Sequence, residues 1–429
     1  MDSFFKKIRY LFRLYVAYIE RYALYFIYSL FGALFIGIAL INRNWVIERI
    51  PVTEKIGIVG SYNLTSLPPE IEKKISLGLT DVATLTATEE GKKYTAVINK
   101  DYYWHDKIKL TAHDINYNFK DVTIAIRDDK TVIFTLKNPY SPFPSLLSKP
   151  LFKKKLVGLG EYKVLSYKIK QGMLESITIT KNNHSGRQIN EFYRFYHTEE
   201  IAKLAFKLGE VNILQNINSV DGLSGNNLQI SKKTNFNQLV GLFFNVNASS
   251  VSEKKIRQGI AYAVPDLFSD QTPALSVISP LSWAYNSDVK PYVQDLENAK
   301  KLLANSKPFT IATPSQYFKE AEIIAAELKK LGVIVNIKPE DYLPLTFQIL
   351  LTAQNIPDDP DQYFLWHSTQ KTTNITGYNS KKVDKLLEDG RRLTKRADRL
   401  SSYLEFQKVI SEDVPVIPLY YPYVYTVKR

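Results

Sequence analysis

Cysteine is absent from the 429-residue sequence. Its absence excludes disulfides, thiolate metal ligands, cysteine nucleophiles and a lipid carried on an N-terminal cysteine. Glycine (18 residues) and proline (20 residues) are present in ordinary numbers, and no internal repeat is found, so collagen-like and low-complexity arrays are excluded as well. Hydrophobic residues make up 45% of the chain, which is enough to build the cores of two or three compact units.

Catalytic motifs are scarce. The five histidines form no H-E-x-x-H motif and no pair at i, i+4, and the G-x-S-x-G and G-x-x-x-x-G-K-[ST] motifs do not occur. S-x-x-K stretches occur, among them those that begin at Ser252 and Ser368, but the sequence has no S-D-N or K-T-G to accompany them. We therefore expect no metal, no cofactor and no catalytic activity. A membrane-anchored extracellular hydrolase is the enzymatic alternative.

The first fifty residues differ from the rest. Tyr22 to Ile41 are twenty residues without a charge, which as a helix would span the hydrocarbon core of a bilayer, about 30 Å thick. Five of the basic residues precede this run, so the positive-inside rule places the N-terminus in the cytoplasm. We expect a cytoplasmic segment at residues 1–21, a single-pass plasma-membrane anchor at 22–41, a linker at 42–54 and an extracellular or periplasmic remainder. A cleaved signal peptide is the competing interpretation, but no small-residue cleavage site follows the run.

The net charge of +13 does not indicate a nucleic-acid-binding protein. The first fifty residues contribute +4, and the remaining +9 is spread over the rest of the chain without a basic run longer than Lys153–Lys155. A solvated basic surface accounts for this distribution.

The rest of the chain has two kinds of sequence pattern. Up to about Lys181 short runs such as "KYTAVINK", "VTIAIRDD", "TVIFTLKN" and "ESITITKN" alternate apolar and polar residues, as half-buried antiparallel strands do. After about Phe192, amphipathic helices alternate with strands, most clearly at residues 315–338, which indicates an α/β domain. Residues 237–247 and 414–421 read as two strands that cross between the two parts, and such a pair of connections is typical of a hinge.

Several ordered motifs resemble one family. "YYWHDKIKLTAHDINYNF" is similar to W-x-D-G-x-x-x-T-A-x-D-V, "VGLGEYKV" to G-T-G-P-Y, and "VGLFFNVNASSVSEKKIRQGIAYAV" to the stretch that enters a second lobe. The residues that match are Trp104, Asp106, Thr111, Ala112, Asp114, Gly158, Gly160, Tyr162, Asn245, Arg257, Ala261 and Ala263. Together with "DPDQYFLWHSTQ" and "EDVPVIPLYY", they resemble, over residues 55–429, the extracellular solute-binding proteins of family 5, the dipeptide- and oligopeptide-binding proteins of ABC importers.

This resemblance implies a fold and a function. The fold is the two-lobed α/β fold of periplasmic binding proteins (type II, cluster C), with lobe 1 at residues 55–240, completed by 414–429, and lobe 2 at 241–413. The function is capture of a peptide or another extended solute between hinged lobes, followed by delivery to the permease subunits of an ABC importer. We expect a monomer. A ligand-sensing surface receptor of the same fold is the remaining alternative.

Two departures from the family bear on the ligand. The segment before Trp104 is short, so the N-terminal lobe is expected to be trimmed. Oligopeptide-binding members carry an aspartate four residues before the proline of the D-P pair, where it binds the amine of the ligand. That position is Ile356 in this chain, and Asp361 is the candidate replacement.

The resemblance and the residue chemistry together nominate the ligand contacts. The candidates are Trp366, His367, Asn374, Tyr378, Tyr421, Tyr423, Asn245 and Asp361. Trp366 and His367 combine stacking with hydrogen bonding, although a core tryptophan and a satisfied rim histidine are the structural alternatives. Tyr421 and Tyr423 lie two apart and would face one side of a single strand.

Overall fold

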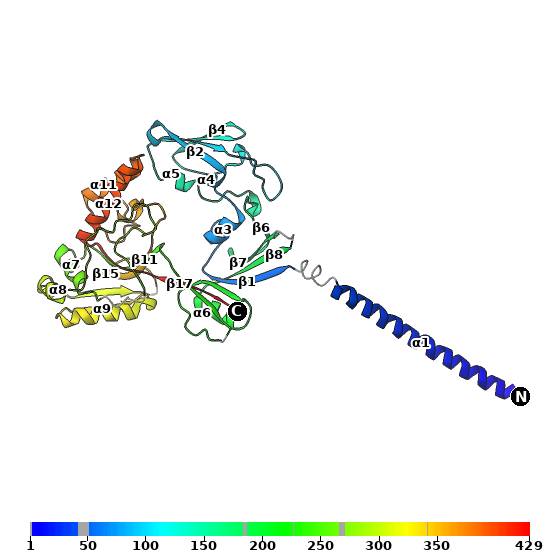
Figure 1. The fold of residues 1–429 in the computed structure, drawn as a ribbon. Helices are drawn as coiled ribbons and strands as arrows, with labels where there is room; N and C mark the ends of the chain where they lie inside the picture. The colour runs from blue at the N-terminus through cyan, green and yellow to red at the C-terminus, as the bar shows by residue number, and fades with distance from the viewer. Residues whose placement is uncertain (1, 42–50, 183–186, 226, 266–270, 341) are drawn as a thin grey trace.

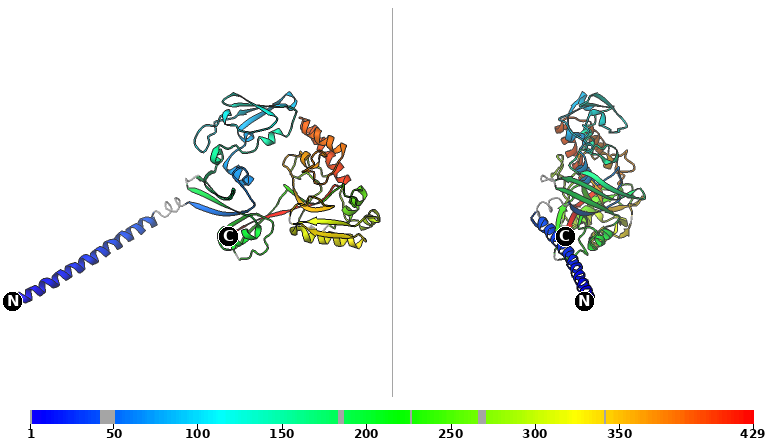
Figure 2. Two further views of the ribbon diagram at one scale, coloured as in Figure 1. Left: turned by 180° about the vertical axis from the view of Figure 1, so that it is seen from behind. Right: turned by 90° about the vertical axis from the view of Figure 1, so that its right-hand side faces the viewer.

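The computed structural model describes residues 2–41, 51–182, 187–225, 227–265, 271–340 and 342–429. Helix α1 (Asp2–Ile41) extends away from the remainder of the molecule, and its described side chains from Phe4 onward are exposed (Figures 1 and 2). Among the described residues, no helix has the length and apolar character that crossing a membrane requires. The structure therefore does not support the anchor predicted over residues 22–41.

A seven-stranded mixed sheet forms the body next to α1. Its strand order is β10-β17-β9-β1-β8-β7-β6, and β1 lies parallel to both β8 and β9. The strands are β1 (Val52–Val59), β6 (Lys163–Lys170), β7 (Met173–Asn182), β8 (Gln188–Tyr196), β9 (Ile213–Ile217), β10 (Gln229–Thr234) and β17 (Tyr423–Lys428). Helix α6 (Glu199–Lys207) begins after Thr198, whose side chain accepts a hydrogen bond from the backbone N–H of Ile201 as an N-cap. We call this body the first lobe.

A six-stranded sheet of order β12-β16-β11-β15-β13-β14 forms the second lobe. Its strands are β11 (Gln238–Phe244), β12 (Thr272–Pro273), β13 (Phe309–Thr313), β14 (Val335–Pro339), β15 (Ile349–Asn355) and β16 (Val416–Tyr421). Helices α7 (Lys254–Ala263), α8 (Leu296–Leu303) and α9 (Phe318–Lys330) pack on one face, and α11 (Lys381–Arg392) and α12 (Arg396–Asp413) pack on the other (Figure 1). Six of the seven residues of β11 are buried because both faces of the sheet are covered.

A third, four-stranded antiparallel sheet has the order β2-β3-β5-β4. Its strands are β2 (Ala83–Thr88), β3 (Lys93–Ile98), β4 (Val122–Asp128) and β5 (Thr131–Leu136), and a separate core that includes Trp104, Phe134 and Phe143 supports it. We call it the small sheet unit and count it as part of the first lobe, because its strands lie in the chain between β1 and β6. Short helices α3 (Pro69–Ile75), α4 (Leu79–Val82), α5 (Phe143–Leu146) and α10 (Tyr363–Trp366) lie in the connections.

The chain passes between the two lobes at two adjacent points. The first passage is residues 235–237, between β10 and β11, and the second is Pro422, between β16 and β17. The backbone N–H of Asn235 donates to the carbonyl oxygen of Pro422 at 2.8 Å, so the two passages lie side by side. The single terminal strand expected from the sequence is thus divided in two at Pro422, which has no N–H to donate to a ladder.

Candidate functional site

The carboxyl ends of the parallel strands in the first lobe point toward the second lobe. Strand β17 starts at the passage and pairs antiparallel with β9, so the end of β9 at Ile217 lies at that edge. Strands β1 and β8 run parallel to β9 and end at the same edge. In open α/β sheets, ligands bind outside the carboxyl ends of the strands. The first lobe therefore presents its ligand-competent edge to the second lobe.

The second lobe presents the equivalent edge. Strand β11 starts at the passage beside Asn355, the last residue of the antiparallel strand β15. Strands β13 and β14 run parallel to β15, so they also end toward the first lobe. Two carboxyl edges consequently face each other on either side of the Asn235–Pro422 passages. Residues 356–361, which follow β15 directly, begin at this edge.

Polar residues along the first-lobe edge were not identified from the sequence. Ser61 follows β1 and His197 follows β8; both side chains are exposed, and the Ser61 hydroxyl lies 3.2 Å from Nδ1 of His197. Asn218, which follows β9, is also exposed. The sequence does show a polar residue shortly after each of these apolar strands. This pattern indicates a shared site only once the three strands are known to be parallel neighbours.

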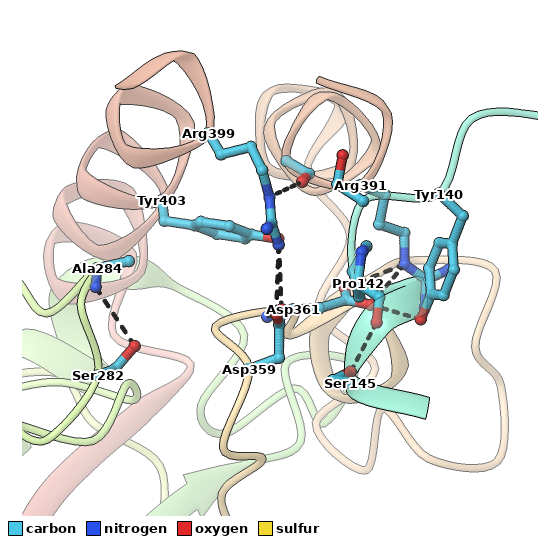
Figure 3. A network of polar contacts seen from close by, with 12 residues as sticks. Tyr140, Pro142, Ser145, Ser282, Ala284, Asp359, Asp361, Arg391, Arg399 and Tyr403 are labelled. Atoms are coloured by element: carbon cyan, nitrogen blue, oxygen red, sulfur yellow. Dashed lines mark hydrogen bonds and ion pairs between the residues drawn. The ribbon is translucent and has the colours of Figure 1, made fainter. Parts of the chain in front are cut away.

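Asp361 is engaged within the protein. Its carboxylate accepts hydrogen bonds from Nε of Arg391 at 2.8 and 3.0 Å and from the hydroxyl of Tyr140 at 3.4 Å (Figure 3). The neighbouring Asp359 accepts from the guanidinium of Arg399 at 3.1 Å. Burial raises the pKa of Asp359, and the Arg399 charge opposes that rise. Each of the two acids thus faces its own arginine.

The predicted stacking residue His367 is stacked, but on a protein ring. Its ring lies 4.0 Å from that of Tyr363 at an interplanar angle of 22°, and its two nitrogens lie 2.8 Å from the Thr369 hydroxyl and 3.3 Å from the Glu388 carboxylate. The guanidinium of Arg391 lies 3.8 Å from the centre of the Tyr363 ring. His367 is 3% exposed, so internal partners surround it.

Trp366 is 1% exposed and belongs to the core of the second lobe. Its indole N–H donates to Oε1 of Gln362 at 3.2 Å. The side-chain amide nitrogen of Asn374 donates hydrogen bonds to the carbonyl oxygens of Trp366, His367 and Tyr378, at 3.3, 3.4 and 2.8 Å. Both side chains therefore stabilise the fold of residues 366–378.

Asn245 and Tyr378 lie away from the passages. Asn245 follows the end of β11 that is remote from Gln238, and its amide nitrogen donates to the carbonyl oxygen of Phe347 at 3.0 Å. Tyr378 donates to the carboxylate of Asp413 at 2.6 Å, and burial raises its pKa. The expectation that Asn245 lies at the passage is corrected, because the passage precedes β11 and Asn245 follows it.

Tyr421 and Tyr423 stand on opposite sides of the second passage. Tyr421 ends β16, is 1% exposed and contacts Phe236 edge to face, with the ring centres 5.3 Å apart. Tyr423 begins β17 in the other sheet, is half-buried and carries Nζ of Lys232 3.5 Å above its ring. The expectation of one shared strand face is wrong because Pro422 separates the two strands.

The amine-binding position of oligopeptide binders is apolar and buried here. Ile356 is 6% exposed and packs in the core of the second lobe. Two residues farther along, Asp358 is exposed, and the described residues offer its carboxylate no ion pair or hydrogen bond. Asp358 was missed from the sequence because nothing local distinguishes it from Asp359 and Asp361. Only the arginines contributed by α11 and α12 separate the three.

In the S-x-x-K stretch that begins at Ser368, the serine is paired with an aspartate and not with the lysine. The Ser368 hydroxyl donates to the Asp384 carboxylate at 2.5 Å, and its backbone N–H donates to the same side chain at 2.8 Å. Across the described ranges, no group of three or more histidine, aspartate and glutamate side chains is arranged to hold a metal ion.

The sequence of the chain matches a known protein family and a characterised relative. The family model for bacterial extracellular solute-binding proteins, family 5 (middle region), matches residues 120–375. The oligopeptide-binding protein AppA of Bacillus subtilis is 24% identical over 443 aligned residues, which cover 84% of this chain and 81% of AppA.

Two solved structures share the fold. The ABC transporter substrate-binding protein CtaP of Listeria monocytogenes superimposes with a TM-score of 0.75 at 22% identity, covering 88% of this chain and 94% of CtaP. The structure of Bacillus subtilis AppA in complex with a nonapeptide gives a TM-score of 0.67 at 21% identity, covering 88% of this chain and 95% of AppA.

Proposed function

Because the chain belongs to the bacterial extracellular solute-binding proteins of family 5, we propose that it is the substrate-binding component of an ABC importer. It captures a peptide-like solute between its two lobes and delivers it to permease subunits as a monomer, without making or breaking a covalent bond. The observation that carries the proposal is the pair of opposed carboxyl edges on either side of the passages at Asn235 and Pro422. A solute that touches both edges stabilises the closed arrangement.

The solute is an extended peptide with a free amine, and Asp358 is the acid that binds this amine. Asp358 is the exposed carboxylate of the second-lobe edge, whereas Asp359 and Asp361 already face arginines. Ser61, His197 and Tyr423 supply contacts from the first lobe. Of the residues nominated from the sequence, Tyr423 combines partial exposure with a position at the passage, so it is the one retained as a direct contact.

Native mass spectrometry tests the capture itself. The full-length protein, incubated with a mixture of peptides two to nine residues long, is expected to retain a subset, and the retained peptides are expected to be recovered uncleaved. Recovery of cleavage products would support the hydrolase alternative. Failure to retain any peptide in the mixture contradicts the proposal.

Isothermal titration calorimetry tests the amine site with a retained peptide. Loss of a charge-assisted hydrogen bond costs about 1.5–3 kcal/mol, so Asp358→Asn is expected to weaken binding by about 10- to 150-fold. The same peptide with an acetylated N-terminus should bind the variant and the parent protein equally. Asp121→Asn, which removes an exposed acid from the small sheet unit, is the matched control and should leave the affinity unchanged. Equal affinities of the Asp358 variant and its parent for the free peptide would exclude Asp358 from the site.

The sequence motivates two further features that we propose, a membrane anchor and a trimmed first lobe. Residues 22–41 anchor the protein in the plasma membrane, with the globular part outside, and the first lobe is trimmed relative to oligopeptide-binding relatives. Washing membranes with alkaline carbonate tests the anchor: the full-length protein should stay in the pellet, and its release into the supernatant would refute the anchor.

A further inference from the structure

The small sheet unit contacts the second lobe at a place remote from the passages. Figure 1 and the view from behind in Figure 2 both place this unit beside α11, across the molecule from the passage into β17. On the side of the small sheet unit the contact comes from Tyr140 and Ser141, which lie between β5 and α5, and from Gly91 in the turn between β2 and β3. On the second lobe it comes from Asp361 and residues 391–394.

Ser141 caps a helix of the other lobe. Its backbone N–H donates to the carbonyl oxygen of Arg391 at 2.7 Å, and its hydroxyl donates to the carbonyl oxygen of Leu393. Both carbonyls belong to the C-terminal end of α11, where carbonyl groups have no partner within the helix. Closure of the two lobes therefore satisfies acceptors that only water can satisfy when the lobes separate.

Tyr140 adds a side-chain contact to a charge pair that is already neutral. Its hydroxyl donates to Asp361, and the guanidinium of Arg391, which neutralises Asp361, lies 5.4 Å from the centre of the Tyr140 ring (Figure 3). Burial and the Asp361 charge raise the pKa of Tyr140 to about 12, so the phenol remains a donor at any physiological pH. Tyr140 thus docks on the Asp361–Arg391 pair without leaving an unpaired charge.

Gly91 makes the third contact, and there is no space for a side chain. A Cβ atom at this position would lie 2.6 Å from Cγ2 of Thr394. Gly91 has a φ of +85°, so its backbone is in the left-handed region. The close approach to Thr394 gives a direct means to push the two lobes apart by a single methyl group.

We propose that Gly91, Tyr140 and Ser141, docked on Asp361, Arg391, Leu393 and Thr394, form an interlobe latch that keeps the protein closed before a solute binds. This inference rests on the proposed function and assigns Asp361 and Arg391 to closure instead of solute recognition. The affinity for a solute scales with the fraction of protein in the binding-competent state. Weakening the latch must therefore reduce the affinity for every solute by the same factor, whereas loss of a direct contact affects solutes unequally.

The distance between the lobes tests the latch without any solute. Because the chain has no cysteine, Lys120→Cys and Lys408→Cys place two spin labels on exposed positions of the small sheet unit and α12. Double electron–electron resonance on the empty full-length protein should show mainly a short distance. Gly91→Ala should shift the population to longer distances, and adding Thr394→Ser, which removes Cγ2, should restore the short one.

Two matched controls separate the latch from general destabilisation. Gly172→Ala imposes the same left-handed strain, at a φ of +78°, but a Cβ there meets nothing within 4 Å, so the short distance should persist. Ser141→Ala should lengthen the distance, whereas Ser145→Ala, which removes a hydrogen bond from α5 to the carbonyl oxygen of Pro142 within the small sheet unit, should not. These variants also keep the test informative if Gly91→Ala fails to fold.

The affinity measurement completes the test. If Gly91→Ala reduces the closed fraction about tenfold, the affinities for two retained peptides of different sequence should both fall about tenfold. Unequal losses, or a long distance in the unmodified empty protein, would overturn the latch. Should no peptide bind at all while the distances behave as expected, the latch stands and the proposed function fails.

Discussion

Replacing Trp366 by alanine is expected to lower the free energy of unfolding by about 3–5 kcal/mol, the range for a large aromatic side chain in a packed core. Trp366 is 1% exposed and contributes to the core beneath α11 and α12. The upper part of the range is expected because Gln362 loses the hydrogen bond that its Oε1 accepts from the indole. Nε2 of Gln362 already has no partner among the described residues, so the buried amide would be left entirely unsatisfied.

Phe364 provides the matched control. It lies two residues before Trp366 on the same short helix, but it is 57% exposed. Phe364→Ala is therefore expected to change the free energy of unfolding by less than about 1 kcal/mol, the scale of its exposed contact with Arg391. The two alanine variants have the same kind of truncation and differ in burial.

Guanidinium denaturation followed by far-ultraviolet circular dichroism measures both variants. Calorimetry with a retained peptide, performed where each variant is still folded, measures whether the indole also contacts the solute. A Trp366→Ala protein with unchanged stability and abolished peptide binding would refute the reasoning, since it would make Trp366 a ligand contact that the core does not need.

Three further changes probe the second lobe. Arg257 donates hydrogen bonds to the carbonyl oxygens of Val251, Ser252, Asp413 and Val414, so Arg257→Met should lower the free energy of unfolding by at least about 3 kcal/mol. Lys255→Met, at an exposed position, should have little effect. Equal losses of stability in the two variants would contradict this role of Arg257. Gly390→Ala places a Cβ 2.7 Å from Cζ of Tyr403 and should raise the free energy of the folded state by about 1–3 kcal/mol, with partial recovery in a Gly390→Ala/Tyr403→Leu double variant; a stable Gly390→Ala protein would refute the packing argument. Burial raises the pKa of Asp359 above its ordinary value of 3.8, so Asp359 binds its proton more tightly in the folded protein than in the unfolded chain. The stability that this proton contributes is therefore lost as the pH rises from about 4 through the pKa of the folded protein. Asp359→Asn should remove that fall from a pH series of denaturation curves, and an identical pH profile would show that burial does not dominate.

Local patterns were sufficient to predict most regular elements. The period-two runs predicted β3, β4, β5 and β7, and the amphipathic run at residues 315–338 predicted α9, because side-chain periodicity is itself the signal for one buried face. The strand predicted after residue 414 was the exception, since Pro422 divides it between two sheets. The ordered motifs were also sufficient to predict the family that the comparison of residues 120–375 confirms.

The sequence could not assign roles within the acidic and aromatic segment at residues 356–378. Asp358, Asp359 and Asp361 have the same side chain, and they differ only in whether an arginine from α11 or α12 reaches them. The segment contains the rings of both Trp366 and Phe364, and packing buries one and exposes the other.

The sequence by itself determined where most helices and strands form and which family the chain belongs to, because these depend on neighbouring residues and on motif order. Only the tertiary structure decided that Asp361 pairs with Arg391 and receives a hydrogen bond from Tyr140, which is 221 positions away. The first contact depends on how α11 packs within the second lobe and the second on how the small sheet unit approaches that lobe, and no local pattern of residues encodes either arrangement.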